Sequence, residues 1–267
     1  MNLSVNTPLI DSHIHLDSYT EQHPLHLESL CNDNVTGVIA VSMDLASSKR
    51  NLEISKIHPT IVHPAFGFHP EQPLPSLQET AQLFSWMENH LQDMVAVGEV
   101  GLPYYAHCEA KEHGHPFDLL PHIDLLEKFI SFAAIHNKPI VLHAVYEDAD
   151  IVCNLLEHYN VTRAHFHWFK GSRDTIKRMA NNGYYISFTP DLVYEAEIQE
   201  LARLYPIHQI MVETDGPWPF EGPFSGQMTH PRMIADVIHA WSQIHNMNVV
   251  EAREMIYSNT KLFYGIT

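Results

Sequence analysis

A chain of 267 residues with 45% hydrophobic and 18% charged side chains has the composition of a globular protein. No apolar run approaches the roughly 18 residues that cross a bilayer, so a membrane protein is excluded. Its 15 lysines and arginines against 32 aspartates and glutamates give a formal charge of −17, which leaves no basic footprint for duplex DNA. The start, MNLSVNTPLIDSHIH, lacks a signal-peptide pattern, and three widely spaced cysteines indicate no disulfide framework, so we expect a cytoplasmic protein.

Short apolar runs alternate with segments of helical periodicity along the chain. The predicted strands are residues 9–16, 37–42, 61–69, 94–102, 139–145, 163–169, 184–189 and 210–215. The predicted helices are residues 45–58, 76–92, 117–136, 149–158, 173–182, 193–204, 231–245 and 249–258. This alternation predicts a parallel sheet, and eight such units have the size of one (β/α)8 TIM barrel, a single α/β domain over residues 1–267. An open doubly wound sheet is the alternative, although no GxGxxG motif follows the first strand.

Potential metal ligands end five of the eight predicted strands. In a parallel barrel the carboxyl ends of the strands form one rim, where active sites are built. The first strand carries two histidines, two residues apart and therefore on the same side. The fourth strand carries one glutamate and the fifth carries one histidine. The sixth carries two histidines, and the eighth carries a glutamate and an aspartate. The residues are His13, His15, Glu99, His143, His165, His167, Glu213 and Asp215.

Each of these residues also has an ordinary structural interpretation. A strand histidine is usually a hydrogen-bonded core residue, Glu99 could pair with a lysine, and Asp215 could cap a turn. All these interpretations would have to hold at once, and a buried unpaired carboxylate is costly. We therefore expect a metal centre.

The ligand count allows two ions, with Glu99 as the bridge between them. One ion would be held by His13, His15 and Asp215, and the other by His143 and His167. Four imidazoles and two carboxylates suit Zn²⁺ or Mn²⁺ better than Mg²⁺ or Ca²⁺. One or two divalent ions are expected, with zinc, manganese and magnesium left open.

Seven motifs extend this pattern over nearly the whole chain: DSHIHLD, GFHP, VGEVGLPYY, KPIVLH, FHWFKG, ETDGPW and SNTKLFYG. In this order they resemble the TatD-type metal-dependent hydrolases, which are amidohydrolase-like TIM barrels. The resemblance implies a metal-dependent deoxyribonuclease, with 3′ exonuclease action among its relatives. It places His69 of GFHP close to the scissile phosphate and selects His167 over His165, which becomes a core residue. The implied ligands are His13, His15, Glu99, His143, His167 and Asp215.

Three positions depart from the pattern of that family. Pro103 stands where the family has aspartate in GLDYY, Val145 stands where it has arginine, and His230 stands where it has asparagine. A valine cannot hold a phosphate bidentately as an arginine does. The ligands are thus retained while the residues expected to bind phosphate are changed.

The insertion AHCEAKEHGHP, residues 106–116, follows the fourth predicted strand on the same rim. His107, Cys108, His113 and His115 match no standard metal-binding spacing. We expect a mobile polar loop that acts as a substrate-selecting lid.

Three functions are compatible with these residues. The first is a phosphodiesterase, most simply a 3′ exonuclease on single strands or frayed ends. In this enzyme Asp215 would orient a metal-activated water and accept its proton, and His69 would stabilise the oxyanion. Glu213 would support a ligand histidine. The second is a small-molecule amidohydrolase or esterase. The third is a noncatalytic metal-binding scaffold. The retention of all six ligand positions and His69 argues against it, because a scaffold would not need metal ions that are open to a substrate. We expect a small-molecule or nucleic-acid-end substrate, and neither strong duplex DNA binding nor membrane binding.

Overall fold

The computed structural model of the chain describes residues 7–20 and 24–266. Residues 1–6, on which the expected absence of a signal peptide partly depends, lie outside this description, as do residues 21–23 and 267 of the predicted domain. None of the described helices is long and apolar enough to cross a membrane.

Eight parallel strands follow one another around the sheet in sequence order, which confirms the predicted barrel. Most strands are shorter than the apolar runs that predict them. The strands are β1 (Leu9–Ile14), β2 (Val35–Ala40), β3 (Val62–Phe66), β4 (Ala96–Gly101), β5 (Ile140–His143), β6 (Ala164–Phe166), β7 (Tyr185–Phe188) and β8 (Ile210–Val212).

The seam between the last and first strands is closed at its carboxyl end. The Asp215 N–H donates to the His13 carbonyl at 3.0 Å, and the His15 N–H donates to the Gly216 carbonyl at 2.8 Å. The buried Asp11 carboxylate accepts the Thr214 N–H at 3.0 Å and the Thr214 hydroxyl at 2.5 Å. Residues next to the predicted ligands therefore also join the two ends of the sheet.

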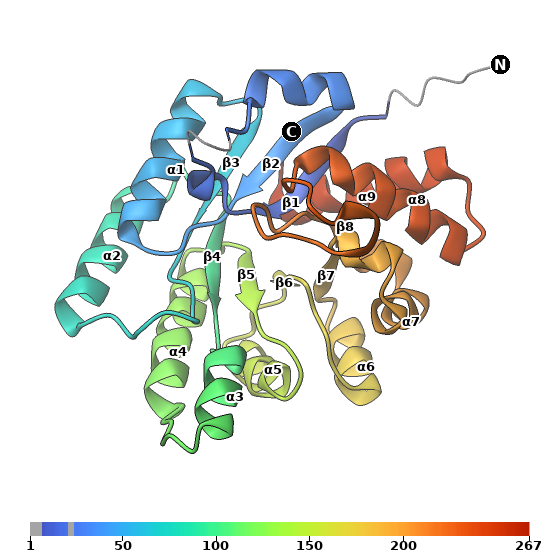
Figure 1. Cartoon of the computed structure of the whole chain (residues 1–267). Coiled ribbons are helices and arrows are strands. Elements are labelled where there is room, and N and C mark those ends of the chain that lie inside the picture. Colours follow the sequence, from blue (N-terminus) through green and yellow to red (C-terminus); the bar gives the residue numbers. More distant parts are fainter. Residues whose placement is uncertain (1–6, 21–23, 267) are drawn as a thin grey trace.

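Helices surround the strands, as Figure 1 shows. They are α1 (Leu45–Ile57), α2 (Leu77–Asn89), α3 (Tyr104–Glu112), α4 (Leu120–Ile135), α5 (Asp148–His158), α6 (Arg173–Asn181), α7 (Ala196–Leu204), α8 (Ile234–Ile244) and α9 (Val249–Tyr264). The described part of the connection from β1 to β2 instead forms two 3-10 helices, η1 (Leu16–Ser18) and η2 (Leu27–Asp33). Two more, η3 (Pro190–Val193) and η6 (Pro231–Met233), precede α7 and α8.

Local capping explains where several helices begin. Ser76 accepts the Glu79 N–H while the Glu79 carboxylate accepts the Ser76 N–H, which is a capping box. Ser172 accepts the Thr175 N–H at the start of α6. The prediction of a loop over residues 106–116 is wrong for its first part, because α3 occupies Tyr104–Glu112.

Two apolar cores support the barrel. The larger one lies between the strands and the surrounding helices. A second core contains Ile10, Ile39, Val141 and Met211 from the strands together with Phe263 and Tyr264 from the end of α9. The Tyr264 hydroxyl also lies 2.8 Å from His165 Nδ1, so the last helix is hydrogen-bonded to a buried strand residue.

Candidate metal centre

The six predicted ligands meet at the carboxyl end of the barrel. His13 and Glu99 lie within β1 and β4, and His143 is the last residue of β5. The other three, His15, His167 and Asp215, lie just after β1, β6 and β8 rather than in those strands. Asp215 has a left-handed backbone with φ 49°, where the chain turns away from β8.

The Glu99 carboxylate is fully buried and lies between two groups of histidines. Its Oε2 is 3.2 Å from His13 Nε2 and 3.2 Å from His15 Nε2. Asp215 Oδ1 is 3.3 Å from His13 Nε2 and 3.4 Å from His15 Nε2. These four atoms form one half-site.

The other oxygen of Glu99 faces the second group. Oε1 is 2.7 Å from His167 Nε2 and 3.1 Å from His143 Nδ1, and these two nitrogens are 3.2 Å apart. His69 Nε2 is 3.5 Å from the same oxygen. These distances place Glu99 between His13, His15 and Asp215 on one side and His143 and His167 on the other. The metal ligation of these residues stays a prediction.

Two observations fit divalent ions in this cluster. Ligand atoms about 2.0–2.2 Å from one ion are roughly 3.0–3.5 Å from each other, which matches the separations above. In addition His13 Nε2, Glu99 Oε2 and Asp215 Oδ1 are buried and make no hydrogen bond to any described residue. Buried polar atoms normally have partners, so lone pairs directed at one another indicate a place for a cation.

The electrostatics of the cluster keep its carboxylates ionised. Burial alone would raise the pKa of Asp215, but the adjacent His13 and His15 imidazoles bring it below its usual value. For Glu99, burial is likewise outweighed by the neighbouring histidines, and its pKa lies well below the ordinary range. Anionic oxygens are what a divalent ion requires of these ligands.

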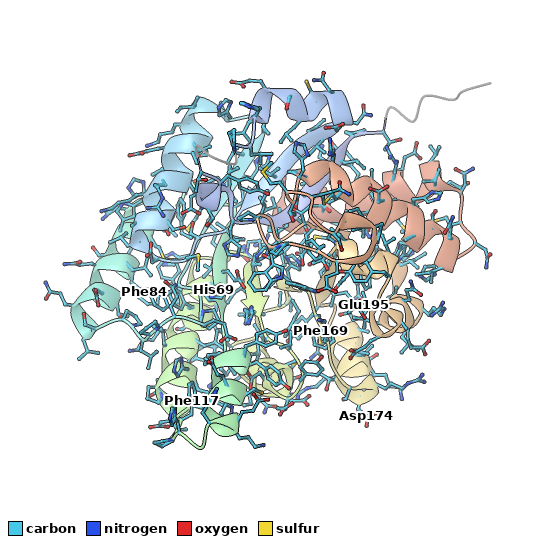
Figure 2. The ribbon with its side chains drawn as sticks, in the orientation of Figure 1. His69, Phe84, Phe117, Phe169, Asp174 and Glu195 are labelled. Carbon is cyan, nitrogen blue, oxygen red and sulfur yellow. The ribbon has the colours of Figure 1, made fainter. Side chains whose placement is uncertain are left out.

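His69 lies near the centre of the ring of helices, as Figure 2 shows, and follows β3. Burial lowers its pKa to about 4, so the ring is neutral near pH 7. The Glu71 N–H donates to His69 Nδ1 at 3.2 Å, which leaves the ring proton on Nε2. His69 therefore directs an N–H donor toward the half-site of Glu99 Oε1.

Glu213 lies behind His167. Its Oε1 accepts the Trp168 N–H at 2.8 Å and is 3.6 Å from His167 Nδ1. Its Oε2 accepts the Ser187 hydroxyl at 2.5 Å, and Ser187 Oγ is 2.6 Å from His165 Nε2. His165 is thus a hydrogen-bonded core residue, as predicted. It contacts the same Ser187 hydroxyl that donates to Glu213.

Other polar residues of the rim were missed by sequence reasoning. Glu71 contacts His143, and Asp191 accepts the Trp168 indole N–H at 2.5 Å. The spacing HxE in HPEQ is the only sequence signal for Glu71. The histidines of residues 106–116 are not part of any group of metal-binding side chains among the described residues.

A comparison with protein families matches residues 10–265 to the model of TatD-related DNases. The chain belongs to this family. It is 36% identical over 258 residues to an uncharacterised metal-dependent hydrolase of Haemophilus influenzae, with 97% of this chain and 100% of that protein covered. It is 25% identical over 268 residues to the human deoxyribonuclease TATDN3, which covers 96% of this chain and 94% of that protein.

The fold agrees with the family. The crystal structure of YjjV, a TatD homologue from Escherichia coli K12, superposes with a TM-score of 0.85 and 22% identity and covers 98% of this chain and 100% of that one. The protein is a TatD-family metal-dependent hydrolase.

Proposed function

We propose that this TatD-family hydrolase cleaves phosphodiester bonds at the 3′ ends of DNA strands. The observation that carries the proposal is the position of His69 Nε2, a neutral N–H donor 3.5 Å from the carboxylate oxygen shared by the second half-site. A hydrogen-bond donor beside two proposed cation sites suits a substrate that is negatively charged and whose negative charge increases in the transition state. The name of the human relative as a deoxyribonuclease supports DNA as that substrate.

His13, His15 and Asp215 would hold one divalent ion and His143 and His167 the other, with Glu99 shared. Ions held there would supply a water that ionises near neutral pH and would neutralise charge on the phosphoryl oxygens. Asp215, which is ionised and 7% exposed, would orient that water and accept its proton. His69 would donate its Nε2 proton in a hydrogen bond to an oxygen of the scissile group. Glu213 would support His167 electrostatically, because its Oε1 lies 3.6 Å from His167 Nδ1.

The charge of the chain favours strand ends over duplex interiors. With a formal charge of −17, long-range attraction for a polyanion is absent. A strand end needs only one or two phosphates at the rim, so bound cations suffice to offset the local repulsion. A single strand or frayed end also exposes its terminal bond without the bulk of a duplex.

A second candidate function is hydrolysis of a small ester or amide, and one feature of the rim favours it. Val145, two residues after His143, is 3% exposed and offers no positive charge. Asp148 and Asp191 follow β5 and β7 on the same rim, where they add carboxylates instead. A small neutral or cationic substrate would meet no electrostatic penalty there.

Assays on one purified preparation distinguish these two candidate functions. The purified protein, with its bound metal measured, is assayed on 3′-labelled single-stranded DNA and on a panel of small phosphodiesters, esters and lactones with Mg²⁺, Mn²⁺ or Zn²⁺. Shortening of the labelled strand that stops with EDTA is expected. Turnover of an ester or lactone with intact DNA would support the second function, and inactivity on all substrates would leave a metal-binding scaffold.

A further inference from the structure

The Glu71 carboxylate lies between a predicted metal ligand and helix α3. It belongs to the connection from β3 to α2, and its Oε1 is 3.2 Å from His143 Nε2. The same carboxylate accepts the Tyr105 N–H at 2.9 Å through Oε1 and the Ala106 N–H at 2.8 Å through Oε2. Its side chain is 17% exposed, so these contacts are partly shielded from water.

Helix α3 depends on this carboxylate for the start of its backbone ladder. The residue before the helix is Pro103, which provides no side-chain cap. The first N–H groups of a helix have no partner within it, and an anion near them also gains from the helix dipole. Glu71 therefore caps α3 from 34 residues away.

The two nitrogens of His143 face opposite partners. Nδ1 points to Glu99 Oε1 and to His167 Nε2, at 3.1 and 3.2 Å, and is thus the atom available to an ion. Nε2 points to Glu71. An ion between Nδ1 and Glu99 would need the Nδ1 lone pair. Glu71, which as an ionised carboxylate only accepts hydrogen bonds, favours the Nε2 proton that leaves this lone pair free.

We propose that Glu71 is a positioning residue that holds His143 in its metal-binding tautomer and joins helix α3 to the metal site. This inference rests on the proposed metal centre. One carboxylate satisfies both partners, so an ion at His143 and an ordered first turn of α3 stabilise each other. The turn carries Tyr105, a half-exposed side chain whose ring centroid is 6.0 Å from that of His143. Glu71 thereby fixes an aromatic group beside the place of reaction.

The test measures metal binding rather than turnover. Mn²⁺ and Zn²⁺ affinities of the wild-type protein and of Glu71→Gln are determined by chelator competition. Loss of an outer carboxylate partner of a ligand histidine weakens metal binding by about 10–100-fold. We expect that loss at one of two sites in Glu71→Gln and an unchanged affinity at the other.

Two control variants distinguish loss of the contact between Glu71 and His143 from a general destabilisation of helix α3. Glu109→Gln removes an exposed charge from α3, and Ala110→Gly destabilises the same helix without touching His143. Glu109→Gln is expected to bind metal as the wild type does, and Ala110→Gly should lose clearly less affinity than Glu71→Gln, because it leaves the contact between Glu71 and His143 in place. If Ala110→Gly weakens binding as much as Glu71→Gln, the effect runs through the helix alone and the assignment to His143 is wrong.

A spectroscopic signal reports the His143 contact directly. In zinc-loaded protein with ¹⁵N-labelled histidine, the Nε2 proton of His143 is expected at low field because it donates to a carboxylate. In Glu71→Gln it should move upfield or vanish by exchange, and in Ala110→Gly it should stay. An unmoved signal in Glu71→Gln would overturn the proposal.

One further measurement needs no variant. Amide exchange at Tyr105 and Ala106 should slow when Zn²⁺ is added to the wild-type protein, and unchanged exchange would contradict the link between α3 and the ion. If the wild type binds no divalent ion at all, the proposed metal centre itself fails. If it binds two ions and Glu71→Gln binds them equally well, only the role of Glu71 fails.

Discussion

Glu99→Gln should weaken both ions at once, because Glu99 offers one oxygen to each half-site. At a free metal concentration 100 times the dissociation constant, each bound ion stabilises the folded chain by about 2.7 kcal/mol. In a chain of this size 1 kcal/mol shifts the melting temperature by roughly 2–4 °C, so two ions should raise it by roughly 10–20 °C. Glu99→Gln should lose most of this rise, whereas Asp215→Asn should lose only the part due to one ion.

The assay combines metal content with thermal unfolding. Each protein is freed of metal, melted with and without added Zn²⁺ or Mn²⁺, and analysed for ions per chain. Glu88→Gln, an exposed change of the same type on α2, serves as the matched control and should keep the full rise. Two ions per chain and an undiminished rise in Glu99→Gln would refute the shared-carboxylate geometry.

Three other changes test separate parts of the structure. Asp215→Asn should lower kcat by about 10²–10⁴-fold with unchanged circular dichroism, and a rate near that of the wild type would remove its role as base. Burial raises the pKa of Asp148 from 3.8 to about 6, so the folded protein is penalised once this carboxyl ionises. The stability linked to its protonated form is complete below pH 3.8 and is lost as the pH rises through about 6. Asp148→Asn should therefore gain roughly 1–2 kcal/mol in urea unfolding at pH 8, allowing for solvent screening, and almost nothing near pH 4. Burial also raises the pKa of the Cys153 thiol to about 12, whereas Cys31 is exposed. A disulfide reagent at pH 8 should thus label Cys31 at once and Cys153 only after unfolding.

The barrel could be predicted from the sequence because its strands and helices are encoded locally. The apolar runs around His13, Glu99 and His143 each contain a strand, and Ser76 and Ser172 mark helix starts through caps that lie within three residues. The predicted ligands meet because strand ends of a parallel barrel share one rim.

The features that escaped prediction depend on contacts between distant residues. Helix α3 could not be read from residues 106–116, since Glu71 caps it from the β3 connection. The contacts of His165 with Ser187 and Tyr264 likewise join three separate elements. The predicted strands extend too far at His15, His167 and Asp215, because the apolar pattern continues into the turns that carry these predicted ligands.

The seam between β8 and β1 has a consequence for how the protein is made. Asp11 and Thr214, which clasp the seam, are 203 positions apart in the chain. A ribosome adds about 5–20 residues each second, so the first strand waits roughly 10–40 s for its partner to be synthesised. During that time His13 and His15 lack Asp215, and the half-site they share cannot be completed. Loading of that half-site should therefore follow synthesis of the last strand, and a chain released before Asp215 should lack it.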